Sequence, residues 1–173
     1  MGPGRPPDPV LAYTDFFENR LRRSLRLAYV MCGNQEEAED IVAEAFARMY
    51  VPWMQGEIEE PVAYLRRAIA NQVNSRWRHK DVERRYDTRV KTLWKSESPA
   101  ADDAIAARDA VDAALATLPE KQRMVVALRY LEDLSEAETA AILDINIGTV
   151  KSHASRGLQR LREVMAESAV RDA

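Results

Sequence analysis

The stretch GTVKSHASRGLQRL, residues 148–161, carries side chains that suit contact with a polyanion. Read at helical spacing, its apolar side is formed by Val150, Ala154, Leu158 and Leu161. Its other side carries Lys151, Ser152, Ser155, Arg156 and Gln159. Such a helix can bury the first side and turn the second either to DNA or only to water. The neighbouring sequence has to decide between these two interpretations.

Catalytic and metal chemistry are not predicted. Ser152 and His153 are adjacent, so on a helix their side chains point about 100° apart, and no acid is placed to orient the imidazole. The lone Cys32 excludes an internal disulfide, and with two histidines the chain offers no zinc cluster. We therefore expect a protein that is not an enzyme and holds no metal or cofactor.

The elements around residues 148–161 predict a helix-turn-helix. Ser135 can cap a short helix that ends near Leu143, the residues DIN form a tight turn, and the next helix continues to about Glu167. In this arrangement the second helix enters the major groove of DNA. A helical hairpin with a merely structural role remains the alternative.

The start of the second helix suits both phosphate and base contacts. Thr149 and the neighbouring backbone amides can meet a phosphate, because a helix N-terminus offers free N–H groups and a positive dipole end. Arg156 can donate two hydrogen bonds to a guanine edge, and the short side chains of Ser152 and Ser155 allow close approach to bases.

The first half of the chain predicts three helices after a Pro- and Gly-rich segment, residues 1–11, that we expect to be disordered. The first should run from about Asp15 to Met31, and Asn34 can cap the second. The buried stripe of the second should be Ala38, Ile41, Val42, Ala45, Phe46 and Met49. The third should open near Pro61 with Val62, Leu65, Ile69, Val73 and Trp77 inward and Arg66, Arg67, Asn71, Asn74 and Arg78 outward.

The composition and the position of the loop-forming residues predict an all-α chain of two small domains. The chain has 173 residues and a net charge of −3, yet residues 66–91 hold nine basic and three acidic side chains. Residues 95–103, KSESPAADD, read as a flexible linker between domains at 12–94 and 104–173. Beyond the linker, helices are expected at 104–118 and 119–131. No segment resembles a membrane span or secretory signal, so we expect an intracellular protein without membrane insertion.

Two motifs in this order resemble the extracytoplasmic-function (ECF) sigma factors of bacterial RNA polymerase. LPEKQRMVVALRYLEDLSEAETAAILDINIGTVKSHASRGLQRLRE is similar to their domain that binds the promoter −35 element. AEDIVAEAFARMY and PVAYLRRAIANQVNSRWRH are similar to their first domain. The resemblance covers nearly all of residues 13–167. It implies a cytoplasmic, nucleoid-associated sigma factor whose partners are core RNA polymerase, promoter DNA and an anti-sigma factor.

The resemblance also implies roles for particular residues. Docking on the clamp helices of the largest polymerase subunit falls to Asp40, Glu44, Arg48 and the exposed flank of Ile41. Reading of the −10 element falls to Tyr64, Arg67, Asn71, Asn74 and Arg78, beside the acidic loop 53–61. Contacts to the −35 element fall to Arg129, Thr149, Lys151, Ser152, Ser155 and Arg156. Trp53 and Trp77 can stack on bases, but core positions are the preferred interpretation.

Two other functions stay open at this point. A stand-alone helix-turn-helix regulator would not contact polymerase, but the first domain resembles no effector-sensing or phosphoacceptor module. A helical protein-interaction module would not bind DNA, and Arg156 and the basic segment 66–91 count against it. Co-purification with core polymerase discriminates among the three.

Overall fold

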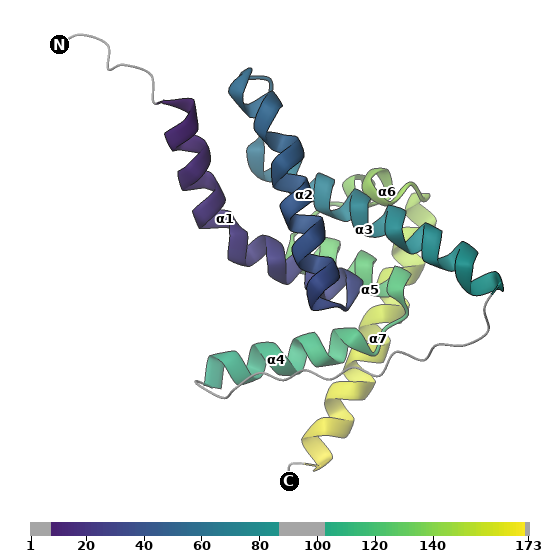
Figure 1. Cartoon of the computed structure of the whole chain (residues 1–173). Coiled ribbons are helices and arrows are strands. Elements are labelled where there is room, and N and C mark those ends of the chain that lie inside the picture. The colour runs from purple at the N-terminus through teal and green to yellow at the C-terminus, as the bar shows by residue number, and fades with distance from the viewer. Residues whose placement is uncertain (1–7, 87–102, 172–173) are drawn as a thin grey trace.

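The computed structural model describes residues 8–86 and 103–171 as an assembly of helices, with no β-strand in these ranges (Figure 1). The elements in chain order are α1 (Pro9–Cys32), α2 (Gln35–Met54), α3 (Pro61–Tyr86), α4 (Asp103–Ala116), α5 (Glu120–Val126), the π-helix η1 (Ala127–Leu131), α6 (Glu136–Leu143) and α7 (Ile147–Arg171). The predicted all-α class is confirmed.

Helices α1 and α2 meet at a tight turn for local reasons. Gly33 adopts φ 80°, a left-handed conformation that ends α1, and its N–H donates to the carbonyl of Tyr29. Asn34 then caps α2, since its side-chain oxygen accepts the N–H of Glu37 at 2.8 Å. The start of α1 differs from the prediction. The Asp8 side chain caps a helix that begins at Pro9, so residues 9–11 are helical and not disordered.

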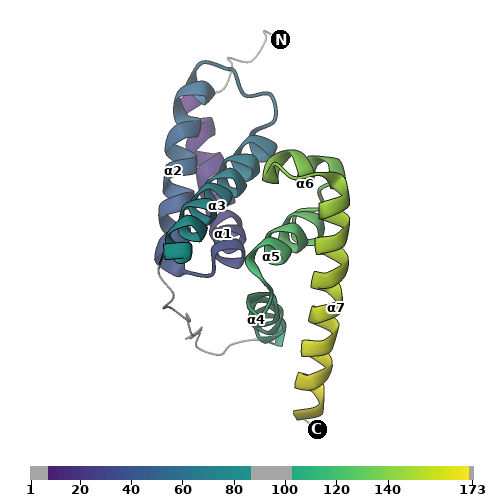
Figure 2. The ribbon, with the colours of Figure 1, turned by 90° about the vertical axis from the view of Figure 1, so that its right-hand side faces the viewer.

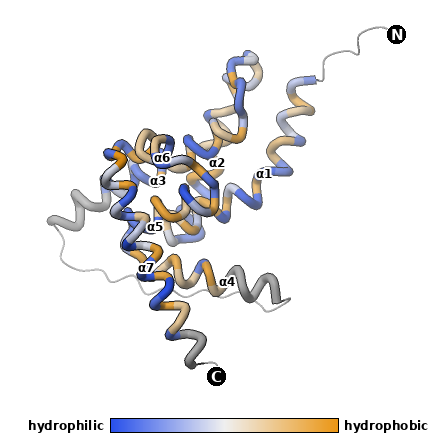
Figure 3. Tube along the Cα trace, turned by 180° about the vertical axis from the view of Figure 1, so that it is seen from behind, coloured by the Kyte–Doolittle hydropathy of each residue, from blue (hydrophilic) through white to orange (hydrophobic). Residues whose placement is uncertain are grey.

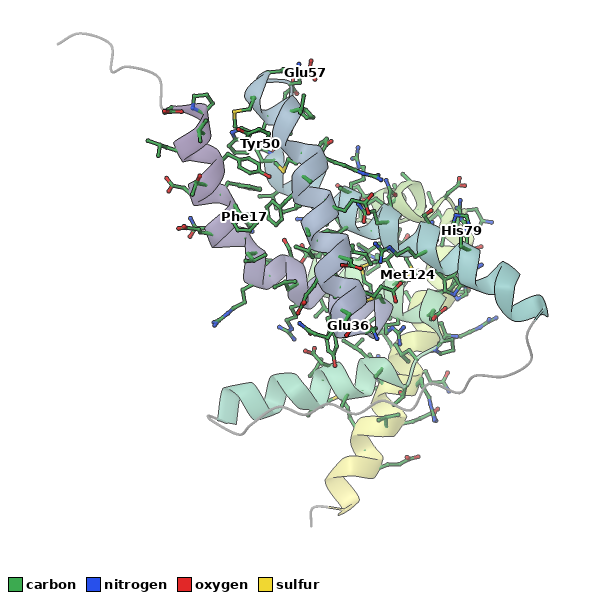
Figure 4. The ribbon with its side chains drawn as sticks, in the orientation of Figure 1. Phe17, Glu36, Tyr50, Glu57, His79 and Met124 are labelled. Carbon is green, nitrogen blue, oxygen red and sulfur yellow. The ribbon has the colours of Figure 1, made fainter. Side chains whose placement is uncertain are left out.

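The apolar stripe predicted for α2 is buried in full: Ala38, Ile41, Val42, Ala45, Phe46 and Met49 are each at most 3% exposed. Aromatic rings from α1 pack on the α2 stripe, and Figure 4 shows Phe17 and Tyr50 between these two helices. Phe17 and Phe46 are 4.7 Å apart at their ring centroids. Trp53 packs against Phe16, and its Nε1 donates to the carbonyl of Pro9 at 3.0 Å. Trp53 is therefore a packing residue.

The second half contains the expected helix-turn-helix. Ser135 and Glu138 form a reciprocal capping box at the start of α6, and Asp144 ends α6 with φ 54°. The helix predicted over 119–131 is instead divided, because its last turn, residues 127–131, is a π-helix. Residue 103 of the predicted linker begins α4, and residues 95–102 lie outside the described ranges.

The two halves share one apolar core rather than separate ones. Buried residues of α1, α2 and α3 belong to the same cluster as those of α5, α6 and α7. Figure 2 shows α6 and α7 beside α3 and α5, and Figure 4 places Met124 of α5 between the halves. Along α7 apolar and polar positions alternate (Figure 3), as expected for a helix with one buried side. Because the core is shared, the two halves cover part of each other's surface.

Candidate nucleic-acid interface

The predicted −10 residues form one stripe along α3. They recur every three or four positions, a spacing that aligns side chains on one side of a helix. Tyr64, Arg67 and Asn71 are exposed in the first half of the stripe. In the second half, Asn74 Nδ2 donates to the carbonyl of Leu143 at 3.1 Å, and Arg78 Nη2 donates to the Asp144 carboxylate at 3.2 Å. The stripe is thus open at one end and occupied at the other.

The open end of the stripe borders a groove of about 560 Å³ between α2 and α3. Tyr64, Arg67 and Asn71 line it, with Glu44 and Arg48 opposite on α2. A further lining residue, Gln72, is 8% exposed, and both polar atoms of its amide lack a hydrogen-bond partner among the described residues. A buried amide without partners is costly, typically about 1–3 kcal/mol. The unpaired amide of Gln72 is therefore buried in the wall of the groove and is not open to it.

The predicted polymerase-docking residues on α2 differ in accessibility. Asp40 has a side chain that is 75% exposed, whereas Ile41 is fully buried, so its predicted exposed flank is wrong. Ile41 is buried because α2 packs between α1 and α3. Arg76 of α3 lies 4.0 Å from the Asp40 carboxylate and 3.7 Å from that of Glu44. Glu44 also pairs with Arg48 and has a side chain that is 41% exposed, so Asp40 is the more exposed of the two acids.

The start of α7 presents part of the predicted −35 set to solvent. Lys151, Ser155 and Arg156 are exposed, and Lys151 Nζ lies 3.6 Å from the Glu136 carboxylate of α6. Arg156 forms no ion pair among the residues that the structure describes. Its guanidinium is therefore available to an acceptor from outside the chain.

Three predicted −35 residues use hydrogen-bonding capacity inside the protein. The N–H of Thr149 donates to Asn146 Oδ1 at 2.7 Å, so Asn146 caps the helix end that was expected to meet a phosphate. Ser152 Oγ donates to the carbonyl of Thr149 at 3.0 Å. Arg129 donates to the carbonyl of Leu134 and thereby ties η1 to the following loop. A phosphate at Thr149 or Arg129 would have to compete with these internal bonds.

His153 adds no positive charge to this surface at neutral pH. Its partial burial and the nearby cations Lys121 and Arg156 lower its pKa below the ordinary value. The Nδ1 atom is buried without a partner among the described residues. His153 therefore behaves as a neutral, partly buried side chain of α7.

Acidification from about pH 7.5 to about pH 5.5 is expected to destabilise the protein more than it destabilises a His153→Gln variant. Because the pKa of His153 is lower in the folded state, the unfolded state binds the proton more readily. The stabilisation is present above the unfolded pKa of about 6.5 and is lost as the pH falls. Urea unfolding of both proteins at the two pH values measures the difference, and parallel losses would contradict the assignment.

Two family descriptions match the chain, Sigma-70 region 2 over residues 16–82 and Sigma-70 region 4 over residues 108–161. The chain is 38% identical to the RNA polymerase sigma-E factor of Streptomyces coelicolor over 89% of its own length and 86% of that protein. It is 30% identical to the ECF RNA polymerase sigma factor SigW of Bacillus subtilis, over 90% of each chain. The chain belongs to the ECF sigma factors of RNA polymerase.

Solved structures agree with this assignment. The sigma factor RpoE of Bartonella quintana, solved in complex with the anti-sigma factor NepR, superposes with a TM-score of 0.65 at 26% identity. The superposition covers 88% of this sigma factor and 97% of that chain. CnrH, solved with the cytosolic domain of CnrY, has the same fold at 16% identity, with a TM-score of 0.57 over 90% of this chain and 88% of that one.

As a member of this family, the protein has core RNA polymerase and promoter DNA as its partners. The two family matches fall on either side of residues 87–102: the first on α1–α3 and the second on α4–α7. The described helices include none that is long and apolar enough to cross a bilayer. Within the same residues, no cluster of His, Cys, Asp and Glu could hold a metal ion.

Three residues of this sigma factor escaped prediction from sequence. Asn146 was read only as part of a turn, although an Asn three residues before Thr149 is a recognisable N-cap signal. Gln72 gave no signal, because a polar residue on a basic helix is expected to be exposed. Glu132 is 9% exposed and pairs with Arg23 and Arg66 from the other half of the chain. No local pattern predicts such long-range partners.

Proposed function

We propose that the α3 stripe and its adjoining groove read the −10 element of the promoter, and that the exposed face at the start of α7 reads the −35 element. The observation that carries the first assignment is the groove itself. It brings an aromatic ring, Tyr64, an exposed amide, Asn71, and a basic side chain, Arg67, to one place. Capture of an unstacked base needs a stacking surface, hydrogen-bonding groups and a cation for the backbone.

The −35 assignment rests on the different chemistry of two exposed residues of α7. Arg156 has no ion pair among the described residues and can donate two parallel hydrogen bonds to guanine. Lys151 is a flexible point charge near the helix start and suits a phosphate. Ser155 is short enough for close approach to a base. We propose smaller contributions to −35 binding from Thr149, Ser152 and Arg129, because each of them already makes an internal hydrogen bond.

Polymerase docking is proposed for the exposed acidic side of α2. Asp40 offers a mostly exposed carboxylate that can pair with a basic residue of a partner. Glu44 and Arg48 can join such an interface only by exchanging their present ion pairs with neighbours. Ile41 is not part of the proposed surface, because it is buried.

The chemistry of RNA synthesis belongs to the polymerase in this proposal, and the sigma factor supplies promoter choice without catalysis. We also propose that it acts in the cytoplasm, where polymerase and chromosome meet. The RpoE structure was solved with an anti-sigma factor. By analogy, we propose that an anti-sigma protein can bind this chain. A stand-alone regulator would leave the polymerase-docking side of α2 without a role.

Two variants, each expected to lose a different property, test the assignment in one reconstituted system. Asp40→Lys should weaken binding to core RNA polymerase by roughly tenfold, because it places a cation where a carboxylate meets basic partners. Asn71→Ala should keep core binding and lose promoter melting. The substitution removes a hydrogen-bonding group from an exposed position and therefore leaves no cavity in the core. Co-purification with core enzyme and permanganate footprinting of the promoter measure the two properties separately.

Each variant serves as the control for the other. Glu36→Lys carries the same charge reversal at an exposed position in the first turn of α2 and should bind core enzyme like the parent. Core binding unchanged by Asp40→Lys would move the docking surface away from this side of α2. Melting unchanged by Asn71→Ala would move −10 reading away from the groove.

A further inference from the structure

Helix α7, the second helix of the helix-turn-helix, packs on α5 at a glycine (Figure 2). Gly157 is buried on the same side of α7 as Val150 and Ala154. A Cβ atom added to Gly157 would lie 2.7 Å from Cγ2 of Val126, the last residue of α5. Carbon atoms in ordinary contact are about 3.5–4.0 Å apart. The two helices are therefore closer at this point than a residue with a side chain would allow.

Glycine is an unfavourable choice at this position unless close approach requires it. Gly157 lies in the interior of a 25-residue helix, where glycine lowers helix stability more than any residue except proline. The backbone of α5 is within reach as well, because the carbonyl oxygen of Gln122 would lie 3.7 Å from the added Cβ. Alanine would make the helix itself more stable but would not fit the contact. The close approach of α5 therefore explains the glycine.

Of the two helices, α7 is the one that can move. The chain around Val126 is packed on all sides, since residues 123–128 are each at most 4% exposed. A β-branched side chain in a helix has one strongly preferred rotamer, so Val126 cannot easily turn away. Helix α7 has solvent on its opposite side, where Lys151 and Arg156 are exposed. A methyl group added at residue 157 would consequently displace α7.

The start of α7 is held more firmly than residue 157, so the displacement is a tilt. Asn146 Oδ1 accepts from the N–H and the hydroxyl of Thr149, at 2.7 and 3.0 Å, and Val150 is fully buried. Residue 157 lies about 10 Å beyond Val150 along the helix. Restoring ordinary contact needs a shift of about 1 Å there, which is a tilt of about 5°. Arg156 then moves almost as far as residue 157, and Lys151 moves little.

We propose that Gly157 is a positioning residue for −35 reading, because it sets the angle at which α7 presents Arg156 to the major groove. The inference rests on the proposed function of Arg156. Binding constellations have to be held within about 0.5 Å of their productive geometry, and a bidentate pair with guanine depends on such alignment. A flexible lysine on a phosphate is less demanding. Gly157 therefore controls base discrimination and leaves the phosphate contact of Lys151 unchanged.

Gly157→Ala should reduce discrimination at the base pair that Arg156 reads by at least about fivefold, the lower end of what a bidentate pair supplies. The salt dependence should keep its slope, because Lys151 still neutralises the same phosphate. Transcription by the reconstituted holoenzyme on every single-base −35 variant, at several salt concentrations, measures both properties. A role in folding alone would instead lower the transcript from all these promoters to the same degree.

Val126→Ala provides the matched control, because it removes the atom against which a Cβ at residue 157 would press. The double variant Gly157→Ala/Val126→Ala should return to within about twofold of parental discrimination, and Val126→Ala alone should keep it. In an Arg156→Ala background, Gly157→Ala should cause no further loss at this base pair, because the reading side chain is already absent. Parental discrimination by folded Gly157→Ala, or no recovery in the double variant, would overturn the inference.

Val126→Leu tests the same contact if circular dichroism shows that Gly157→Ala does not fold. Its side chain reaches one carbon further from α5 while α7 keeps its glycine, so it should displace α7 and lose the same discrimination. Parental discrimination by Val126→Leu would then overturn the inference and leave the proposed function intact. Failure of the proposed function has another signature: Arg156→Ala would keep the parental base preference, and the inference would fall with it.

Discussion

An Arg123→Ala variant is expected to lose about 2–4 kcal/mol of its free energy of unfolding. Arg123 lies in α5, is only 4% exposed and donates from Nε to the carbonyl of Met31 at 3.2 Å. That carbonyl lies in the last turn of α1, where carbonyl groups lack partners within the helix. The substitution removes a long buried side chain and unpairs a buried acceptor between the two halves.

Two comparisons separate packing from hydrogen bonding at this site. Arg123→Met fills most of the volume but cannot donate, so it should lose about 1–3 kcal/mol, the usual cost of a buried unpaired group. Arg162→Ala, at an exposed position on α7, should change stability by less than about 0.5 kcal/mol. Urea unfolding monitored by circular dichroism measures all three. A loss below 1 kcal/mol for Arg123→Ala would mean that this guanidinium does not join the halves.

Arg156→Ala should relax the preference at one −35 base pair by about 1–3 kcal/mol, which is roughly a 5- to 150-fold loss of discrimination. The guanidinium is the one planar, two-pronged donor among the proposed −35 residues of α7, and it forms no ion pair among the described residues. A bidentate pair with guanine depends on that shape. Binding to promoters that already lack the preferred base should change little.

Lys151→Ala should produce a loss of a different kind. Its ammonium group neutralises one phosphate, so all promoter sequences should weaken about equally and the salt dependence should become shallower by about one unit of slope. The present partner of Lys151 is Glu136, at 3.6 Å on the protein surface, and such pairs contribute little. Lys151 therefore loses little free energy when it exchanges this carboxylate for a phosphate.

Transcription by the reconstituted holoenzyme on every single-base −35 variant, at several salt concentrations, measures both effects. Glu163→Ala on the exposed part of α7 provides a control outside the proposed contacts. A uniform defect for Arg156→Ala together with a base-specific defect for Lys151→Ala would reverse the two roles. Parental behaviour of both variants would show that this helix does not read DNA.

Sequence by itself determined the elements whose causes are local. The buried stripe of α2, the cap at Asn34 and the capping box at Ser135 depend on residues within a few positions of each other. The helix-turn-helix follows from the same short-range rules. Two motifs in one order were also enough to place the chain in its family, because family membership depends on sequence similarity alone.

Tertiary structure decided which of the predicted polar residues are free to act. The spacing that placed Asn74 and Arg78 on the same stripe as Asn71 did not reveal that the turn after α6 occupies them. The exposed flank expected for Ile41 disappears because α2 has neighbours on two sides. Trp77 lies under the ammonium group of Lys121, 4.4 Å from its ring centroid, which is a contact between the halves.

The physical reason is the range over which each interaction acts. Helix periodicity and capping are fixed by covalent neighbours, so the order of residues contains them. Burial and ion pairing depend on groups that meet only after the chain has folded, such as Glu132 and Arg23, which are 109 positions apart. The sequence therefore predicted a set of side chains for DNA contact, and the packing of the two halves decided which of them already have partners inside the protein.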